Sequence, residues 1–67
     1  MLRIEIERED DGRWIAEVPG LPGVMTYGAT ESEARVRVKA LALRVIADRF
    51  EHGEALPREI ASLFEAA

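Results

Sequence analysis

The residues of this 67-residue chain that come closest to a catalytic set are four carboxylates, Glu5, Glu7, Glu33 and Glu65. A two-metal nuclease gathers acids from a first strand, a crossover helix and a following strand, and these four fall in roughly those places. Glu5 and Glu7, however, alternate with apolar residues as on a solvated strand face, and Glu33 follows a helix-capping threonine by three residues. We therefore expect no catalytic residue, no metal site and no cofactor.

The remaining reactive side chains have no partner for catalysis in the sequence. His52 is the single histidine. It falls at a predicted helix end, where it interacts with the helix dipole, and general-base catalysis needs a positioned partner. Ser32 and Ser62 have no neighbouring histidine, which argues against a hydrolytic triad. The chain is predicted not to be an enzyme.

The charge distribution favours a basic protein partner over nucleic acid. The net charge is −4, and the first 30 residues contain three arginines against six acids. An acidic hairpin of this kind is complementary to a basic protein, although a solvated acidic surface that keeps the chain soluble is an equal alternative. The basic residues at 31–51 are interleaved with acids, which is typical of the flanks of a packing surface and not of a phosphate-binding stripe.

Two runs of alternating apolar and charged residues, 2–7 and 13–18, predict a pair of half-buried strands. A two-residue turn between them would mix the buried and exposed faces. A three-residue loop over 10–12 instead pairs Ile6 with Ala16, so we expect this longer loop, with its glycine in the left-handed region.

A loop rich in proline and glycine, 19–23, interrupts the ladder, and residues 24–27 read as a short third strand. Gly28 ends that strand. The loop glycines and Gly28 lack the spacing of a phosphate-binding loop, so we expect them in turns with unusual dihedral angles. Thr30 then caps a helix predicted from about 31 to 52, with Glu33 completing a capping box.

This helix has two apolar stripes, whereas a surface helix normally has one. The first is expected to cover the sheet: Ala34, Val38, Leu41, Ala42, Val45 and Ile46. The second lies nearly opposite: Val36, Ala40, Leu43, Ala47 and Phe50. Either the C-terminal tail or another chain must cover the second stripe. Because so short a chain without cysteine has a marginal core, we predict a homodimer or higher oligomer with contacts at Val36, Leu43, Ala47 and Phe50.

The expected fold is one α+β domain over residues 1–67. It is a β-β-β-α-(β) two-layer sandwich, in which an antiparallel three-stranded sheet packs on one long helix. Residues 58–67 fit a short helix or a short strand, and we favour a strand from about Ser62. Ile15, with Met25 and Tyr27 in one parity of the third strand, would lie on the sheet face opposite the helix and offer a protein contact.

The order of these signals resembles HicB-family antitoxins. The matching landmarks are the start of the first strand, the Asp11-Gly12 turn, Trp14, Ala16-Glu17-Val18-Pro19, Leu21-Pro22-Gly23, Gly28, Thr30 and Glu33-Ala34. The resemblance implies a partial RNase H-like domain that binds a small basic ribonuclease toxin, a HicA-like protein, and masks its active site. The contact residues we assign to this role are Glu9, Asp10, Asp11, Ile15, Met25 and Tyr27.

The alternatives are a solitary scaffold of the same family, a nucleic-acid-associated regulator and a minimal metal-dependent nuclease. Only ~15 residues follow the long helix, too few for the ribbon-helix-helix or helix-turn-helix segment of many family members, so direct DNA binding is not expected. No secretion leader or membrane span is evident, which predicts a cytoplasmic protein. The absence of Asn, Gln and Cys, with eight of nine basic residues being arginine, fits a thermophile.

Overall fold

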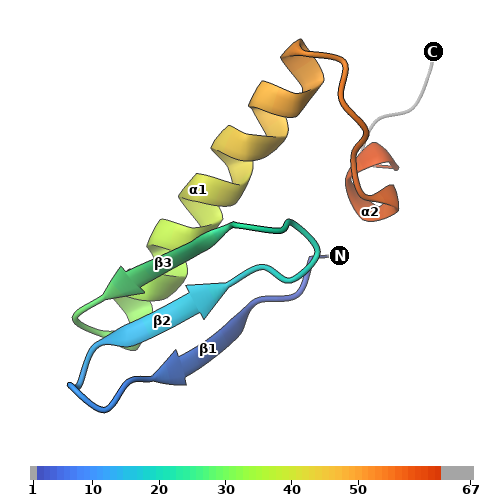
Figure 1. The fold of residues 1–67 in the computed structure, drawn as a ribbon. Coiled ribbons are helices and arrows are strands. Elements are labelled where there is room, and N and C mark those ends of the chain that lie inside the picture. The colour runs from blue at the N-terminus through green and yellow to red at the C-terminus, as the bar shows by residue number, and fades with distance from the viewer. Residues whose placement is uncertain (1, 63–67) are drawn as a thin grey trace.

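The chain forms a three-stranded antiparallel sheet in the order β1-β2-β3 with one long helix across one face (Figure 1). The elements of this computed structural model are β1 (Glu5–Arg8), β2 (Trp14–Glu17), β3 (Met25–Gly28), α1 (Glu31–Glu51) and α2 (Arg58–Ala61). The structure describes residues 2–62, the side chain of Glu59 excepted. This α+β, two-layer arrangement confirms the fold expected from the sequence. Within the described residues, no helix is both long and apolar enough to cross a bilayer.

The register of the β1–β2 hairpin is the one predicted from strand parity. Ile6 lies opposite Ala16, and Ala16 is completely buried. The connecting loop is closed by the Gly12 N–H, which donates to the Glu9 carbonyl at 2.9 Å, and Gly12 has a φ of +90°. Because side chains alternate along a strand, this register turns Ile6 and Ala16 toward α1 and places Glu5, Glu7, Ile15 and Glu17 on the opposite face.

The proline- and glycine-rich loop inserts a leucine into the core. Leu21 is completely buried, and its N–H donates to the Val18 carbonyl at 2.9 Å. The Val18 N–H in turn donates to the Val24 carbonyl at 3.0 Å, which closes the loop. The buried core is made of Ala16, Val18, Leu21, Val24, Ala34, Val38 and Ala42. The loop therefore supplies packing as well as a change of chain direction.

Gly28 is required for a close approach between β3 and α1. A Cβ atom at this position would lie 2.5 Å from the Ala34 backbone nitrogen and 2.9 Å from its Cα. The glycines with positive φ are Gly12, Gly23 and Gly53, so the prediction of an unusual dihedral angle is confirmed for Gly23 and wrong for Gly20 and Gly28. The missing side chain of Gly28 is what allows the first turn of α1 to rest on the sheet.

The start of α1 is capped as predicted, but by half of the expected motif. The Glu33 N–H donates to the Thr30 hydroxyl at 3.0 Å. The Glu33 carboxylate pairs with Arg37 on the next turn and does not complete a capping box. The expected helix end is confirmed to within one residue, because α1 stops at Glu51 and Gly53 follows with a φ of +66°.

The two stripes of α1 have different surroundings. The first stripe faces the sheet, where Ala34 and Val38 are fully buried and Ala42 is nearly so. In the second stripe, Val36 is 64% exposed and Leu43 is 68% exposed. The half of α1 after its midpoint projects beyond the sheet (Figure 1), and within residues 2–62 no second sheet or long helix covers its outer side.

The segment after α1 turns back toward the N-terminus and forms the short helix α2 (Figure 1). Its Ile60 is 5% exposed. Of the two alternatives for this segment, the helix is therefore the one found for residues 58–61. The strand favoured from about Ser62 and the acid Glu65 fall on residues 63–67, outside the described part of the chain.

Candidate functional site

The face of the sheet opposite α1 is not covered by any described element. The register places its residues in two transverse rows, Glu5–Glu17–Met25 and Glu7–Ile15–Tyr27. Together with Arg13 we call these residues the outer sheet face. Ile15, Met25 and Tyr27, predicted to share this face, are indeed brought together, with Met25 at 45% exposure and Tyr27 at 40%. The sheet thus presents apolar and acidic side chains side by side.

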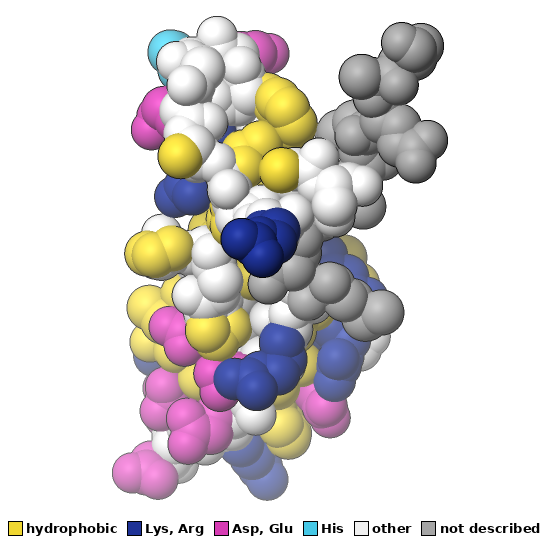
Figure 2. All heavy atoms as spheres, turned by 90° about the vertical axis from the view of Figure 1, so that its right-hand side faces the viewer, with side chains coloured by type: hydrophobic (Ala, Val, Ile, Leu, Met, Phe, Trp, Pro, Cys, Tyr) yellow, Lys and Arg dark blue, Asp and Glu magenta, His cyan; other side chains and the backbone are white. Residues whose placement is uncertain are grey.

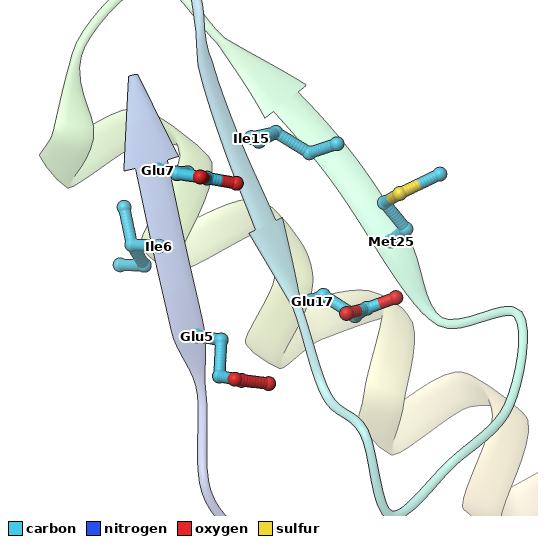
Figure 3. Close-up of a pocket in the computed structure, with 6 residues that line it drawn as sticks. All are labelled: Glu5, Ile6, Glu7, Ile15, Glu17 and Met25. Carbon is cyan, nitrogen blue, oxygen red and sulfur yellow. The ribbon is translucent and has the colours of Figure 1, made fainter. Parts of the chain in front are cut away.

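A shallow hollow of about 280 Å³ lies on this face, among Glu5, Ile6, Glu7, Ile15, Glu17 and Met25. In Figure 3 the three glutamates project from the side of the sheet turned away from the helix. Glu5 has a loose, exposed pair with Arg3, at 3.9 Å. Within residues 2–62, Glu7 and Glu17 form no ion pair or hydrogen bond through their carboxylates. The hollow is therefore a site of unbalanced negative charge beside two apolar side chains.

The other end of the outer sheet face is organised by an arginine. The Arg13 guanidinium carbon lies 4.6 Å from the centroid of the Tyr27 ring, within the range of a cation–π contact. The Asp11 carboxylate accepts from the Arg13 backbone N–H at 3.0 Å and from Arg13 Nε at 2.8 Å. These two bonds lower the pKa of the Asp11 carboxyl from its ordinary value. Asp11 and Tyr27 are thus joined through Arg13, which sequence reasoning did not include.

The remaining loop acids lie at the tip of the hairpin, apart from the hollow. Asp10 is exposed and Glu9 is half-buried, and the Glu9 N–H donates to the Arg13 carbonyl at 2.7 Å. The acids that do line the hollow, Glu5, Glu7 and Glu17, were missed as contact residues because their alternation reads as an ordinary solvated strand face. Their shared parity with Ile15 in the predicted register was the available signal.

A second exposed apolar surface lies on α1. Three exposed side chains, Val36, Leu43 and Phe50, follow one another at intervals of seven residues, and we call them the helix seam. Beside the seam is an apolar groove of about 480 Å³, lined by Leu2, Ile4, Val18, Lys39, Ala42, Leu43, Ile46, Ala47, Phe50 and Ile60. Figure 2 shows hydrophobic side chains on the upper part of this side, below the histidine that marks the end of α1.

The acids considered for a nuclease are not gathered at one place within the described residues. Glu5 and Glu7 are on the outer sheet face, whereas Glu33 belongs to the helix on the other face and pairs with Arg37. The sheet therefore lies between them.

The ligand atoms of Asp48, His52 and Glu54 lie within 4.8 Å of one another at the end of α1, and all three residues are exposed. His52 Nδ1 is 2.8 Å from the Asp48 carbonyl oxygen, which only accepts, so this nitrogen carries a proton and is not a ligand. The contact agrees with the predicted role of His52 at the helix end. The trio offers one ligand from each residue, which is one short of the closed four-ligand shell of a structural zinc site.

The chain is 36% identical over 56 residues to the UPF0150 protein Ta0767 of Thermoplasma acidophilum. The match covers 84% of this chain and 81% of that protein. No protein-family model matches the chain, and no solved structure matches it.

Proposed function

This chain belongs to the UPF0150 family, and we propose that it is a HicB-like antitoxin module without catalytic activity of its own. Its partner is a small basic ribonuclease toxin of the HicA type, which it binds and masks. The observation that carries the proposal is the outer sheet face, where an uncovered hollow combines three carboxylates with Ile15 and Met25.

The chemistry of the hollow suits a lysine or arginine side chain of a partner. The aliphatic stem of such a residue packs on Ile15 and Met25, while its charged end reaches the carboxylates of Glu7 and Glu17. A ribonuclease binds a polyanion, so its active site presents cations, and an acidic face competes for the same groups. Occupation of the toxin's cationic site by carboxylates is thus a direct way to block RNA binding.

The long-range field of the chain supports the same encounter. The net charge is −4, and the acids of the first 30 residues outnumber the arginines by six to three. Complementary charge of this kind raises the rate of association with a basic protein and makes the rate sensitive to salt. The loop acids Glu9 and Asp10, at the tip of the hairpin, belong to this field and not to the hollow.

The proposal is tested by co-expressing the chain with the product of a short, basic open reading frame adjoining its gene. We expect the two proteins to co-purify and the chain to inhibit RNA cleavage by its partner. The double variant Glu7→Arg, Glu17→Arg is expected to lose inhibition, whereas the matched control Glu51→Arg, Glu54→Arg, which changes two exposed acids away from the sheet, is expected to retain it.

Two outcomes would replace the proposal. Cleavage of RNA by the pure chain in Mg²⁺ or Mn²⁺, abolished by EDTA and by Glu33→Gln, would make it a nuclease. Retention on heparin with a steep salt dependence would make it a nucleic-acid-binding regulator.

A further inference from the structure

Helix α1 is much longer than the sheet that it covers. Its 21 residues extend for about 31 Å at 1.5 Å per residue. A strand of four residues, such as β3, extends for only about 13 Å. More than half of the helix therefore lies beyond the strands, and Figure 1 shows it projecting past the sheet. Two of the three seam residues lie in this projecting part: Leu43, which is 68% exposed, and Phe50, which is 47% exposed.

The seam has the spacing of a helix–helix contact. Residues seven apart are nearly two full turns apart, so Val36, Leu43 and Phe50 lie almost on one line along α1. The line is about 21 Å long at the helical rise. Ala40 and Ala47 lie beside it, and such small side chains let a second helix come close. Val36, Leu43 and Phe50 are 64%, 68% and 47% exposed.

The whole chain exposes more surface than a compact monomer of its mass. The chain exposes 5069 Å² for a mass of 7.5 kDa. A compact monomer of that mass is expected to expose about 4,250 Å². The excess, roughly 800 Å² summed over the whole chain, is of the order of the area that each partner buries in a typical specific interface.

We infer that the helix seam binds a second copy of this chain, with the two α1 helices antiparallel about a two-fold axis near Leu43. Val36 and Phe50 are equally distant from Leu43 in the sequence. A two-fold axis at Leu43 therefore places Leu43 against its counterpart and sets each Val36 beside the partner's Phe50. A seam symmetric about its own centre is what an isologous interface requires. This arrangement also places the large Phe50 side chain against the smaller Val36. The two helix dipoles then point in opposite directions, which is favourable.

A second copy fits the seam better than the proposed toxin does. Lys39 lines the apolar groove and Arg44, next to Leu43, is exposed. These cations disfavour docking of a basic protein on this side of α1, whereas the seam residues themselves are apolar and carry no charge to oppose a second copy. The self-association does not depend on the proposed function, because it involves the helix and not the outer sheet face.

The inference is tested by cysteine cross-linking, since the chain has no cysteine of its own. We expect the unmodified protein to sediment at twice its 7.5 kDa. Under mild oxidation, Leu43→Cys is expected to form a covalent dimer. Val36→Cys alone and Phe50→Cys alone are not, because identical residues at those positions lie about 21 Å apart along the antiparallel pair, too far for a disulfide. An equimolar mixture of those two variants is expected to cross-link to each other.

A monomeric mass at micromolar concentration overturns the inference, and so does self-linking of Val36→Cys as rapid as that of Leu43→Cys. As a second readout, Leu43→Asp is expected to halve the mass while the circular dichroism of the monomer stays native, because the site is exposed. The Glu7→Arg, Glu17→Arg variant is expected to remain dimeric. If the Glu7→Arg, Glu17→Arg variant loses toxin binding but keeps the mass of a dimer, the two surfaces act independently. Leu43→Asp is expected to show the opposite result, a monomeric mass with toxin binding retained. The two variants therefore separate a failure of one proposal from a failure of the other.

Discussion

The outer sheet face and the helix seam are both exposed, yet they differ in the chemistry that they offer to a partner. The sheet face exposes carboxylates, which water solvates well, so it is stable without a partner and attracts a cationic one from a distance. The seam exposes aliphatic and aromatic side chains, whose burial is favourable against almost any apolar surface. If both proposals hold, the sheet face binds an exchangeable, charged partner and the seam forms a permanent contact.

The largest expected effect comes from the core on which both surfaces depend. Leu21→Ala removes a completely buried side chain and is expected to lower the free energy of unfolding by about 2–5 kcal/mol. Urea denaturation followed by circular dichroism measures the loss. Leu43→Ala provides the matched control. It removes the same atoms from an exposed seam residue, so it is expected to change the free energy of unfolding of a single chain very little. The loss of stability caused by Leu43→Ala is expected to increase with protein concentration, because the dimer forms more completely. A loss that does not depend on concentration would contradict the proposed contact at the seam.

Charge reversal in the hollow is the next largest effect. Glu7→Arg with Glu17→Arg is expected to weaken binding of a basic partner by at least tenfold, since each change replaces a charge-assisted contact by repulsion. Calorimetry measures the change in affinity. Raising NaCl from about 0.05 to 0.5 M is expected to weaken the same complex but not the seam, because salt screens charges and leaves apolar burial intact. Equal salt sensitivity of the two contacts would remove the distinction between them.

A smaller effect is expected at the helix cap. Thr30→Ala removes the hydroxyl that accepts from the Glu33 N–H and is expected to cost about 1 kcal/mol of stability. Thermal denaturation measures it. Ser32→Ala, an exposed hydroxyl inside the first turn, is the control and is expected to change stability far less. Because the cap lies where α1 meets β3, its loss should affect both surfaces alike and leave their relative affinities unchanged.

The smallest effect concerns the arginine end of the sheet face. Hydrogen bonds from the Arg13 backbone and side chain hold the pKa of the Asp11 carboxyl below its ordinary value of 3.8. A lowered folded-state pKa means that this contribution to stability is complete above 3.8 and is lost as the pH falls through the lowered pKa. Arg13→Ala is expected to raise the Asp11 pKa toward its ordinary value in a carboxyl NMR titration. Arg3→Ala should leave that pKa where it is.

The fold was largely predictable because its determinants are local. The alternation around Ile6 and Ala16 set the strand register, and Thr30 marked the start of α1. The reason for Gly28 was not predictable, because it lies in the distance between β3 and the Ala34 backbone, which only the packed structure reveals. The partner chosen by Glu33 also escaped prediction, since Arg37 offers it a stronger interaction than the cap N–H.

The candidate sites were predictable in part. The seam residues followed from the helical period, and Ile15 and Met25 from strand parity. The carboxylates of the hollow, such as Glu17, escaped attention because a charged strand residue has an ordinary explanation. The motif residues that carry the family resemblance have structural roles: Leu21 packs, Gly28 makes room and Thr30 caps. These residues identify the scaffold, whereas Ile15 and Met25 of the hollow lie between the landmarks.

The sheet packs against the first half of α1, and the helix continues well past it. In an antiparallel pair centred on Leu43, each sheet would therefore lie near its own end of the assembly, and the two acidic hollows would be held apart. Such a pair is bivalent, with a stoichiometry of two to two. Filling one hollow would leave the affinity of the other unaltered, so titration with a basic partner would follow a simple hyperbola.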